Sequence, residues 1–365
     1  MQRNLPSVLV PLLACAVWAG PVRASDVVVV RIGDGSAALG TTTAPVFLER
    51  RASDGSLVST PIAMPTAASG LDFPFALSGT GTTEGALALS LDGNHLTLAG
   101  YAAAPGFDPS TASRVVAMVD PAGNVDTTTS LGNAFASAAR GAVTDDGTTF
   151  WMCGSGGSAG NGGVWYELLG LNGGTQLMSS PGNVRVLSIV NGQLYGSSGS
   201  NNYASIFTIG SGLPDTTGLT ATVLPGLPTS GASPYAFVFF DRTGVAGLDT
   251  LYIADDRATG SGGGIQKWTF NGSTWSLQAT FTNGLTTGVR GLAAEVVGGH
   301  VVLYATTATT STLVDQNKLV RVVDDGTASP AFSVLATAAA NTVYRGVAMA
   351  WVPPVLDAVF ADGFE

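Results

Sequence analysis

Four arginines stand directly before short apolar runs at similar intervals along the chain. They are Arg140, Arg185, Arg290 and Arg345, and Glu84 and Pro234 hold the same place before two further runs. A guanidinium group is always charged, and its planar fork matches a carboxylate or a phosphate. If the six runs are equivalent strands of a repeated unit, these residues form a ring, which we expect to bind an anion. In the alternative, each arginine bonds loop carbonyls or pairs with an aspartate and holds neighbouring units together.

Loops that would lie above this ring contain further ligand-binding candidates. Their residue ranges are 101–112, 154–163, 197–203, 255–263 and 306–317. Tyr101, Tyr203, Asp255 and Asp256 stand out within these Gly-, Ser-, Asn- and Thr-rich segments. Aromatic and polar side chains over a shallow cup suit a glycan, a peptide or a small anion, and loops commonly carry function. The alternative for each of these residues is a solvated connection.

Acidic residues define a second hypothesis, a lyase or a lactonase-like hydrolase. Glu84 or Glu295 would act as acid or base while the arginines stabilise an anionic intermediate. An enzyme should expose a carboxylate inside the ring beside a pocket, whereas a binding protein should show a broad cup with carbonyl-saturated arginines. The two histidines, His95 and His300, begin second strands and so face away from the ring. That placement argues against a Ser-His-Asp arrangement.

The segment 241–249 vaguely resembles an aspartate-rich calcium loop. Calcium takes several oxygen ligands, usually carboxylates at alternate positions. Only Asp241 and Asp249 remain as ligands here, because Val245 stands where an oxygen donor should be. We therefore expect no cofactor, with calcium at this loop as the alternative.

Each apolar run begins a unit of short segments with strand character, and the runs start roughly 45 to 56 residues apart. Most runs continue through a hairpin turn: Asp92-Gly93, Asp146-Gly147, Asn191-Gly192 and Gly298-Gly299. In such turns both central residues adopt positive φ. A second strand follows, then a third (115–119, 164–169, 206–209, 265–269 and 319–323), and then an edge-like fourth. Four antiparallel strands at this period are typical of one blade of a β-propeller.

The sixth run, at Arg345, has no partner strands after it. The segments 27–32, 45–49 and 57–63 near the start of the chain are left unassigned and have strand character. We therefore predict an all-β propeller of six four-stranded blades, closed by one C-terminal strand joining three N-terminal ones. Such closure removes exposed sheet edges. The alternative is a seventh blade that uses residues 66–83, which include Leu71 to Leu77.

One hairpin resembles a known family. Asp249 to Asp256 reads DTLYIADD, and Gly264 to Gly272 reads GIQKWTFNG, a pattern similar to the hairpins of NHL-type and related six-bladed propellers. The resemblance is strong over about 25 residues and fainter in the other repeats. Such propellers include binding modules and lactonase- or lyase-type enzymes. The resemblance therefore implies a fold and leaves the chemistry open.

The first residues carry an export signal. A basic start, an apolar stretch from Leu5 to Gly20 and the small residue Ala24 form a signal peptide, residues 1–24, with cleavage expected after Ala24. The alternative is a lipoprotein anchored at Cys15. We place one propeller domain at 25–353 and a tail at 354–365, which resembles the acidic-aromatic GFE endings of secreted proteins from Xanthomonas-related bacteria. We expect a secreted, extracellular or periplasmic protein.

The composition narrows the class of partner. Charged residues make up 11% of the chain, the formal net charge is -10, and 49 residues are glycine. A nucleic-acid binder needs a basic surface, so we expect no nucleic-acid partner. After residue 24 no apolar stretch is long enough to span a membrane. We predict a monomeric, non-catalytic module that binds or interacts with an extracellular glycan, peptide or small anion.

Overall fold

The computed structural model describes residues 24–132, 134–156, 160–309 and 317–351. The expected signal peptide apart from Ala24, the alternative lipid-attachment site at Cys15 and the tail 354–365 lie outside these residues. Within the described residues, no helix combines the length and the apolar character needed to cross a membrane. The described chain is almost entirely strand and loop, with short 3-10 turns such as η1 (Pro109–Thr111).

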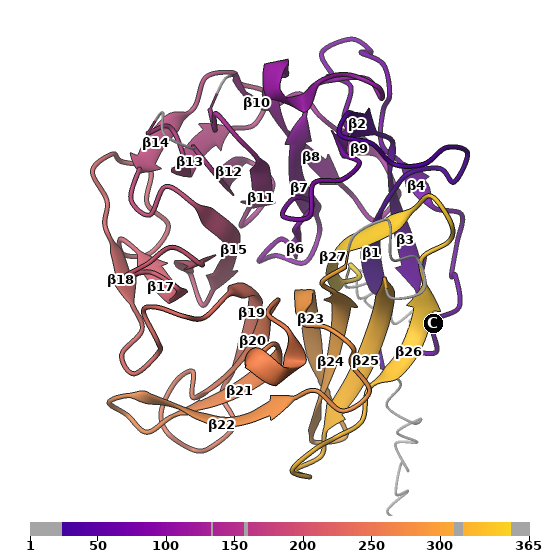
Figure 1. Ribbon diagram of the computed structural model, residues 1–365. Helices are drawn as coiled ribbons and strands as arrows, with labels where there is room; N and C mark the ends of the chain where they lie inside the picture. Colours follow the sequence, from indigo (N-terminus) through magenta and orange to yellow (C-terminus); the bar gives the residue numbers. More distant parts are fainter. Residues whose placement is uncertain (1–23, 133, 157–159, 310–316, 352–365) are drawn as a thin grey trace, which may run out of the picture.

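Six antiparallel sheets stand around a central axis (Figure 1). The first sheet formed by consecutive strands contains β6 (Leu87–Leu89), β7 (Leu96–Tyr101), β8 (Arg114–Val119) and β10 (Ser130–Gly132), with β9 (Val125–Asp126) also paired to β8. The second contains β11 (Ala139–Val143), β12 (Thr149–Gly154), β13 (Gly163–Leu168) and β14 (Thr175–Met178). The third contains β15 (Val184–Val190), β16 (Gln193–Ser198), β17 (Ser205–Ile209) and β18 (Ala221–Val223).

Two further sheets repeat this order. One contains β19 (Pro234–Phe240), β20 (Thr250–Asp255), β21 (Gly264–Phe270) and β22 (Trp275–Phe281). The other contains β23 (Val289–Val297), β24 (His300–Thr307), β25 (Lys318–Asp324) and β26 (Ser333–Thr337). With the closing sheet described next, these elements form the predicted six-bladed β-propeller.

The closing sheet joins the two ends of the described chain. Its order is β27 (Val343–Met349), β1 (Val27–Ile32), β3 (Val46–Arg51) and β4 (Ile62–Ala63). β1 lies between β27 and β3, and its valines are fully buried, as expected of a strand covered on both faces. The predicted closure by one C-terminal and three N-terminal strands is confirmed. The last strand is shorter than expected, with Leu57 forming only an isolated bridge to Arg51.

Residues 66–83 do not form a seventh blade, so that alternative was wrong. The segment contributes only β5 (Leu77–Ser78), which pairs with the two-residue strand β2 (Thr43–Ala44). Two of its apolar residues, Phe75 and Leu77, are fully buried in the core, whereas Leu71 is 83% exposed. The Phe75 ring packs on Gly100, where an added Cβ would lie 2.4 Å from its Cζ.

The hairpin turns reach their geometry in two ways. Asn191 and Gly192 both have positive φ, as predicted, at 49° and 71°. In the Asp-Gly turns only the glycine does, for example Gly93 at 76°. There the aspartate side chain accepts a hydrogen bond from the backbone two residues on, as Asp92 does from the Asn94 N–H at 3.0 Å. This side-chain bond makes a left-handed aspartate unnecessary.

A β-bulge opens each innermost strand where the arginines lie. The register with the next strand shifts at Arg140 in β11, Arg185 in β15, Arg290 in β23 and Arg345 in β27. A bulge leaves one extra residue out of the pairing and re-aims its side chain. The four predicted arginines are therefore structurally equivalent.

Tyr235 holds this position in β19. The register there shifts between Pro234 and Phe237, in the same pattern as between Val289 and Leu292 in β23. The predicted alignment, which placed Pro234 in the ring, was wrong by one residue. Proline lies one step earlier, at the first residue of the strand, where its missing N–H is tolerated.

Glycine follows three of the four arginines, and at two of these glycines a neighbouring inner strand approaches closely. At Gly346 an added Cβ would lie 2.3 Å from the Gly85 carbonyl oxygen and 2.4 Å from the Leu87 nitrogen. At Gly291 it would lie 2.9 Å from the Arg345 carbonyl oxygen on β27. Each Arg-Gly pair therefore places an arginine at the bulge and, next to it, a residue without a Cβ. At two of these positions the missing Cβ allows the neighbouring blade to pack closely.

Candidate functional site

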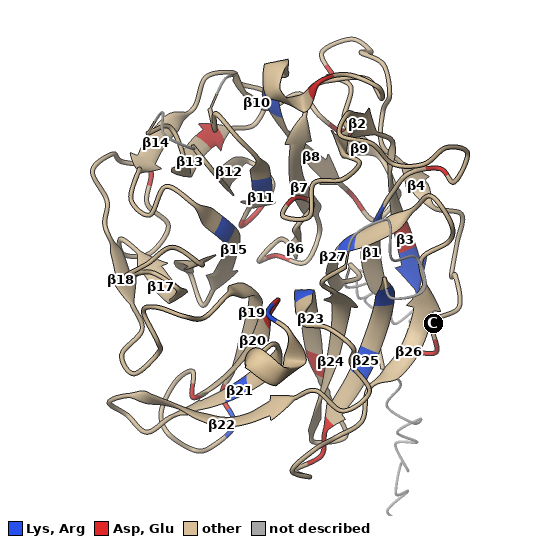
Figure 2. Ribbon diagram, in the orientation of Figure 1, with Lys and Arg blue, Asp and Glu red and all other residues tan. Residues whose placement is uncertain are grey.

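A narrow pocket lies where the bulged positions meet. Arg185, Arg290 and Arg345 border it together with Glu84 and Tyr235. Its volume is about 40 Å³, room for a few water molecules or a small anion. In Figure 2 the basic positions on β11, β15, β23 and β27 lie around the centre of the ring. Three of the four predicted arginines thus meet at one pocket, which is narrow and not the broad cup that we expected.

Arg140 and Arg345 are buried charges with incomplete partners. Arg140 is 8% exposed, and its Nε and Nη1 atoms have no hydrogen-bond partner among the described residues. Arg345 is 5% exposed and donates to the carbonyls of Gly81 and Tyr344 at 3.1 and 3.2 Å, while its Nη2 has no partner in the described chain. Burial lowers the pKa of both groups, that of Arg345 to about 9. The charge of Glu84 acts on both guanidinium groups, but neither forms a direct ion pair with a carboxylate in the described chain, so the cost of burying them is only partly offset.

The aromatic ring of Tyr235 contacts the guanidinium groups of two of the arginines. The guanidinium carbon of Arg185 lies 4.3 Å from the centre of its ring and that of Arg290 lies 5.3 Å away. Both distances fall within the range of a cation–π interaction. Tyr235 is only 5% exposed, so these contacts are shielded from water. The tyrosine thus holds two cations at the pocket without neutralising either.

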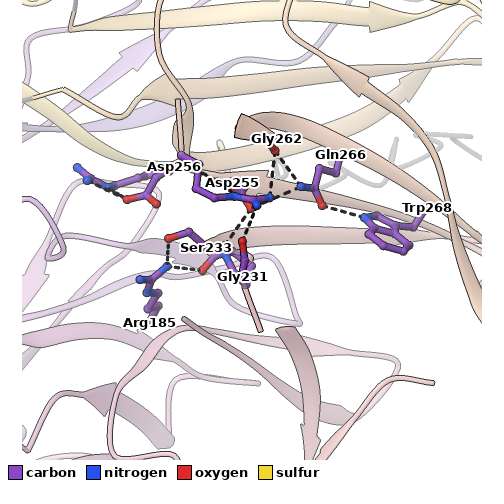
Figure 3. Close-up of polar contacts among 11 residues, drawn as sticks. Arg185, Gly231, Ser233, Asp255, Asp256, Gly262, Gln266 and Trp268 are labelled. Atoms are coloured by element: carbon purple, nitrogen blue, oxygen red, sulfur yellow. Dashed lines mark hydrogen bonds and ion pairs between the residues drawn. The ribbon is translucent and has the colours of Figure 1, made fainter. Parts of the chain in front are cut away.

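The loop after β20 connects the pocket to the neighbouring blade (Figure 3). Asp256 accepts hydrogen bonds from Arg290 Nε and Nη2 at 3.0 and 2.9 Å. Arg185 donates to Ser233 Oγ at 2.8 Å and to the Pro234 carbonyl at 3.2 Å. The alternative, in which the arginines bond loop carbonyls or pair with an aspartate, therefore describes Arg290, and in part Arg185 and Arg345, which donates to the Gly81 carbonyl. It does not describe Arg140.

The Asp255 side chain holds this loop in place through hydrogen bonds. Its side chain is 1% exposed and accepts from the Ser233 N–H at 3.0 Å and from Arg257 Nε at 2.8 Å (Figure 3). Gln266 also approaches it, and Gln266 in turn accepts from Trp268 Nε1 at 3.1 Å. Asp255 therefore positions Ser233 and the Asp256 loop, and it does not border the pocket.

Glu84 is the carboxylate inside the ring. It is 7% exposed, and its oxygens accept from the Tyr101 hydroxyl at 2.7 Å and the Ser78 N–H at 3.0 Å. Burial raises the pKa of Glu84, while these hydrogen bonds and the charges of Arg345 and Arg140 oppose the rise. Tyr101 is therefore a buried support behind Glu84 and does not lie over an open cup.

Two further predicted residues, Tyr203 and Glu295, also do not border the pocket. Tyr203 packs edge-on against Phe207, with ring centres 6.2 Å apart, at the margin of a hydrophobic cluster. Glu295 lies five residues beyond Arg290 on β23, so about 16 Å of extended chain separates their backbones. Its carboxylate contacts the Ser25 nitrogen and the Tyr304 hydroxyl. The prediction that Glu295 faces the ring was therefore wrong, because the two residues lie at opposite ends of one strand.

The two aspartates of the segment 241–249 have different surroundings. Asp249 is fully buried, and its carboxylate accepts from the backbone N–H groups of Arg242 and Thr243 at 2.6 and 2.5 Å. Asp241 is exposed. In the described part of the chain no group of three His, Cys, Asp or Glu residues is arranged to hold a metal ion. Asp249 thus organises the hairpin loop through hydrogen bonds.

Two contributors to the site were missed from the sequence. Tyr235 was missed because Pro234 was aligned with the arginines, whereas the strand register makes Pro234 equivalent to Val289 and Tyr235 equivalent to Arg290. Arg114 was also missed: its guanidinium lies 5.0 Å from the Tyr101 ring and donates to the carbonyls of Phe135 and Ser137 at 2.7 and 2.8 Å. It supports the Tyr101–Glu84 pair from the neighbouring strand.

No protein-family model and no curated protein matches this chain. Among solved structures, a "putative 6-phosphogluconolactonase" from Bacteroides uniformis shares 13% identity over 86% of this chain and 83% of its own, with a TM-score of 0.46. The GH74 enzyme of Niastella koreensis shares 15% over 84% and 47%, with a TM-score of 0.43. A glycosyl hydrolase from Bacteroides ovatus shares 15% over 87% and 85%, with a TM-score of 0.37. At such identities the likeness concerns the fold alone and assigns no activity.

Proposed function

We propose that this protein is a secreted, non-catalytic propeller that binds a small oxyanion, a carboxylate or phosphate group, at the arginine pocket. The observation that carries the proposal is the pair Arg140 and Arg345, whose buried guanidinium nitrogens lack partners in the described chain. A buried charge without a countercharge is costly, on the order of several kcal/mol. A bound anion would remove that cost, and the free energy recovered would contribute to its binding free energy.

The charge balance at the pocket supports an anion. Arg185 and Arg345 border the pocket, and neither has a salt-bridge partner within the described residues. Arg140 does not border it, but its charge interacts with those of Arg185 and Glu84, and it too has no salt-bridge partner there. Asp256 pairs with Arg290. Glu84 is the one further carboxylate bordering the pocket. Cations therefore outnumber anions there, although the chain as a whole carries a formal charge of -10.

The size of the pocket supports a small ligand. A volume of about 40 Å³ suits the head of an oxyanion better than the enclosed binding of a sugar ring or a peptide segment. Arginine forks suit the paired oxygens of such a group, and the contacts of Tyr235 with Arg185 and Arg290 would hold two of those forks in place. Of the three expected ligand classes, the small anion therefore has the most support.

The second candidate function, a lyase or hydrolase, depends on Glu84. A carboxyl group with a raised pKa beside several arginines is the arrangement that a general acid requires. However, both oxygens of Glu84 already accept hydrogen bonds, from Ser78 and Tyr101, which hold the side chain in place. Of the two acids considered from the sequence, Glu295 is distant from the pocket. The binding function is therefore the better supported.

Isothermal titration calorimetry with inorganic phosphate, sulfate and acetate, in a buffer free of other oxyanions, tests the proposal. We expect one saturable site per chain and no heat with glucose, a neutral control of larger size. Chains that bind none of the three anions at millimolar concentration would contradict the proposal. Turnover of lactone or glycoside substrates that is lost in Glu84→Gln would favour the enzyme.

A further inference from the structure

The nitrogen of Ser25 lies against a carboxylate on the adjacent blade. Glu295 Oε1 and Oε2 are 2.9 and 3.1 Å from the Ser25 nitrogen. Ser25 stands two residues before β1 of the closing blade, whereas Glu295 belongs to β23. The Tyr304 hydroxyl donates to Glu295 Oε1 at 3.1 Å and so orients the carboxylate. The contact therefore joins two blades at the point where the chain enters the fold.

The position of the Ser25 nitrogen also suits an ammonium group. As an amide, its single hydrogen is shared between both carboxylate oxygens in a bifurcated bond. A terminal ammonium carries three hydrogens and can donate to both oxygens at once. Glu295 also makes no ion pair with a basic side chain within the described part of the chain. A positive charge on Ser25 would supply the missing countercharge.

The residue after Ser25 is already fastened to the fold. Asp26 accepts from Arg50 Nε at 2.8 Å through its side chain, and its carbonyl accepts from the Ala350 N–H at 3.0 Å. The ordered attachment to the closing blade therefore begins at Ser25 and Asp26. Upstream, the sequence reads Val22-Arg23-Ala24, with the small residue that export peptidases require at the bond they cut.

We propose that the Ala24–Ser25 bond is a processing site and that Glu295 is the receptor for the amino terminus released there. A signal-type peptidase adds one water across the amide: its oxygen goes to the Ala24 carbonyl carbon, and both its hydrogens end on the Ser25 nitrogen. Ala24 leaves as a carboxylate on the removed segment, and Ser25 becomes an ammonium. The ion pair with Glu295 then fastens the closing blade to β23. This inference stands independently of anion binding.

The first test is the intact mass of the exported protein, which should correspond to a chain beginning at Ser25. The second uses periodate, which cleaves a 1,2-amino alcohol and therefore converts only an amino-terminal serine, here into an aldehyde without a positive charge. We expect oxidation to lower the Tm of the parent protein by about 0.3–1.4 °C, since the contact is exposed. In Glu295→Gln it should cause no further loss. Asp146→Asn, which removes a charge from an exposed turn on another blade, should respond like the parent.

Three results would overturn the inference. An exported chain that begins at another residue excludes the processing site at Ala24. An equal fall in Tm after oxidation of the parent and of Glu295→Gln excludes Glu295 as the receptor. No fall in either protein excludes an ion pair that contributes to closure.

Discussion

Arg140→Met separates the binding of an anion from the stability of the ring. The substitution removes a guanidinium that is 8% exposed and has two partnerless nitrogens in the described structure, and it keeps an unbranched side chain of similar length. The methionine has no charge to desolvate. We expect the variant to unfold at a higher temperature than the parent when no anion is present, and to bind anions more weakly.

The structure sets the magnitude of both effects. Replacing a buried, uncompensated charge by an apolar side chain of similar volume should stabilise the free protein by about 1–3 kcal/mol. For a chain of this size the entropy of unfolding is about 0.7 kcal/mol/K, so the Tm should rise by about 1–4 °C. Loss of charge-assisted bonds to the anion should cost about 1.5–3 kcal/mol, a fall in affinity of about 10- to 150-fold.

Calorimetric titration with sulfate and scanning calorimetry at zero and saturating sulfate measure both quantities. At a concentration of about 100 times Kd, sulfate should stabilise the parent by about 2.7 kcal/mol, a Tm rise of about 4 °C, and Arg140→Met by far less. Arg242→Met is the matched control, because Arg242 is exposed at the rim opposite the pocket and carries the same charge. An Arg140→Met variant that is less stable than the parent and binds sulfate equally tightly would show that Arg140 is neither an uncompensated charge nor part of an anion site.

Three further predictions follow from the same contacts. Because burial raises the pKa of Glu84, the folded protein takes up a proton as the pH falls toward the ordinary value of 4.5; anion affinity and stability should both rise over that interval, and titrations of Glu84→Gln should show neither change. Asp256→Asn removes the partner of Arg290, so calorimetry should show about three- to tenfold tighter anion binding, and unchanged affinity would exclude Arg290 from the site. Gly346→Ala places a Cβ 2.3 Å from the Gly85 carbonyl oxygen, so thermal melting should show a loss of about 1–3 kcal/mol, whereas an unchanged Tm would mean that the blades do not approach so closely.

The blade architecture was predictable because each hairpin has a local signal. Turns such as Asn191-Gly192 mark where strands reverse, and the apolar runs mark the innermost strands. The closing sheet could be predicted by counting strands. The last apolar run had no further strands after it to complete a blade, and three strands at the start of the chain had no innermost strand before them. From the sequence, residues 66–83 could be either part of a blade or a loop packed against one. A buried aromatic residue such as Phe75 is compatible with both, because it occurs in strands and in loops that fill the core.

The site was predictable only in outline. Equivalent positions in a repeat meet around an axis, so the four arginines could be placed together from spacing alone. Their partners could not, because Asp255 and Asp256 are neighbours in sequence yet one faces Arg257 and the other Arg290. The position of Glu295 was missed for a related reason: a nine-residue strand carries its two ends to opposite rims of the ring.

Soaking a crystal in selenate, a sulfate analogue with a strong anomalous signal, tests directly whether the arginine pocket binds an anion. We expect an anomalous peak in the pocket, within hydrogen-bond distance of the partnerless nitrogens of Arg140 or Arg345. The peak should be lost in a crystal of Arg140→Met soaked in the same way. A pocket that holds only water at saturating selenate, with unchanged arginine side-chain positions, would show that it does not bind an anion.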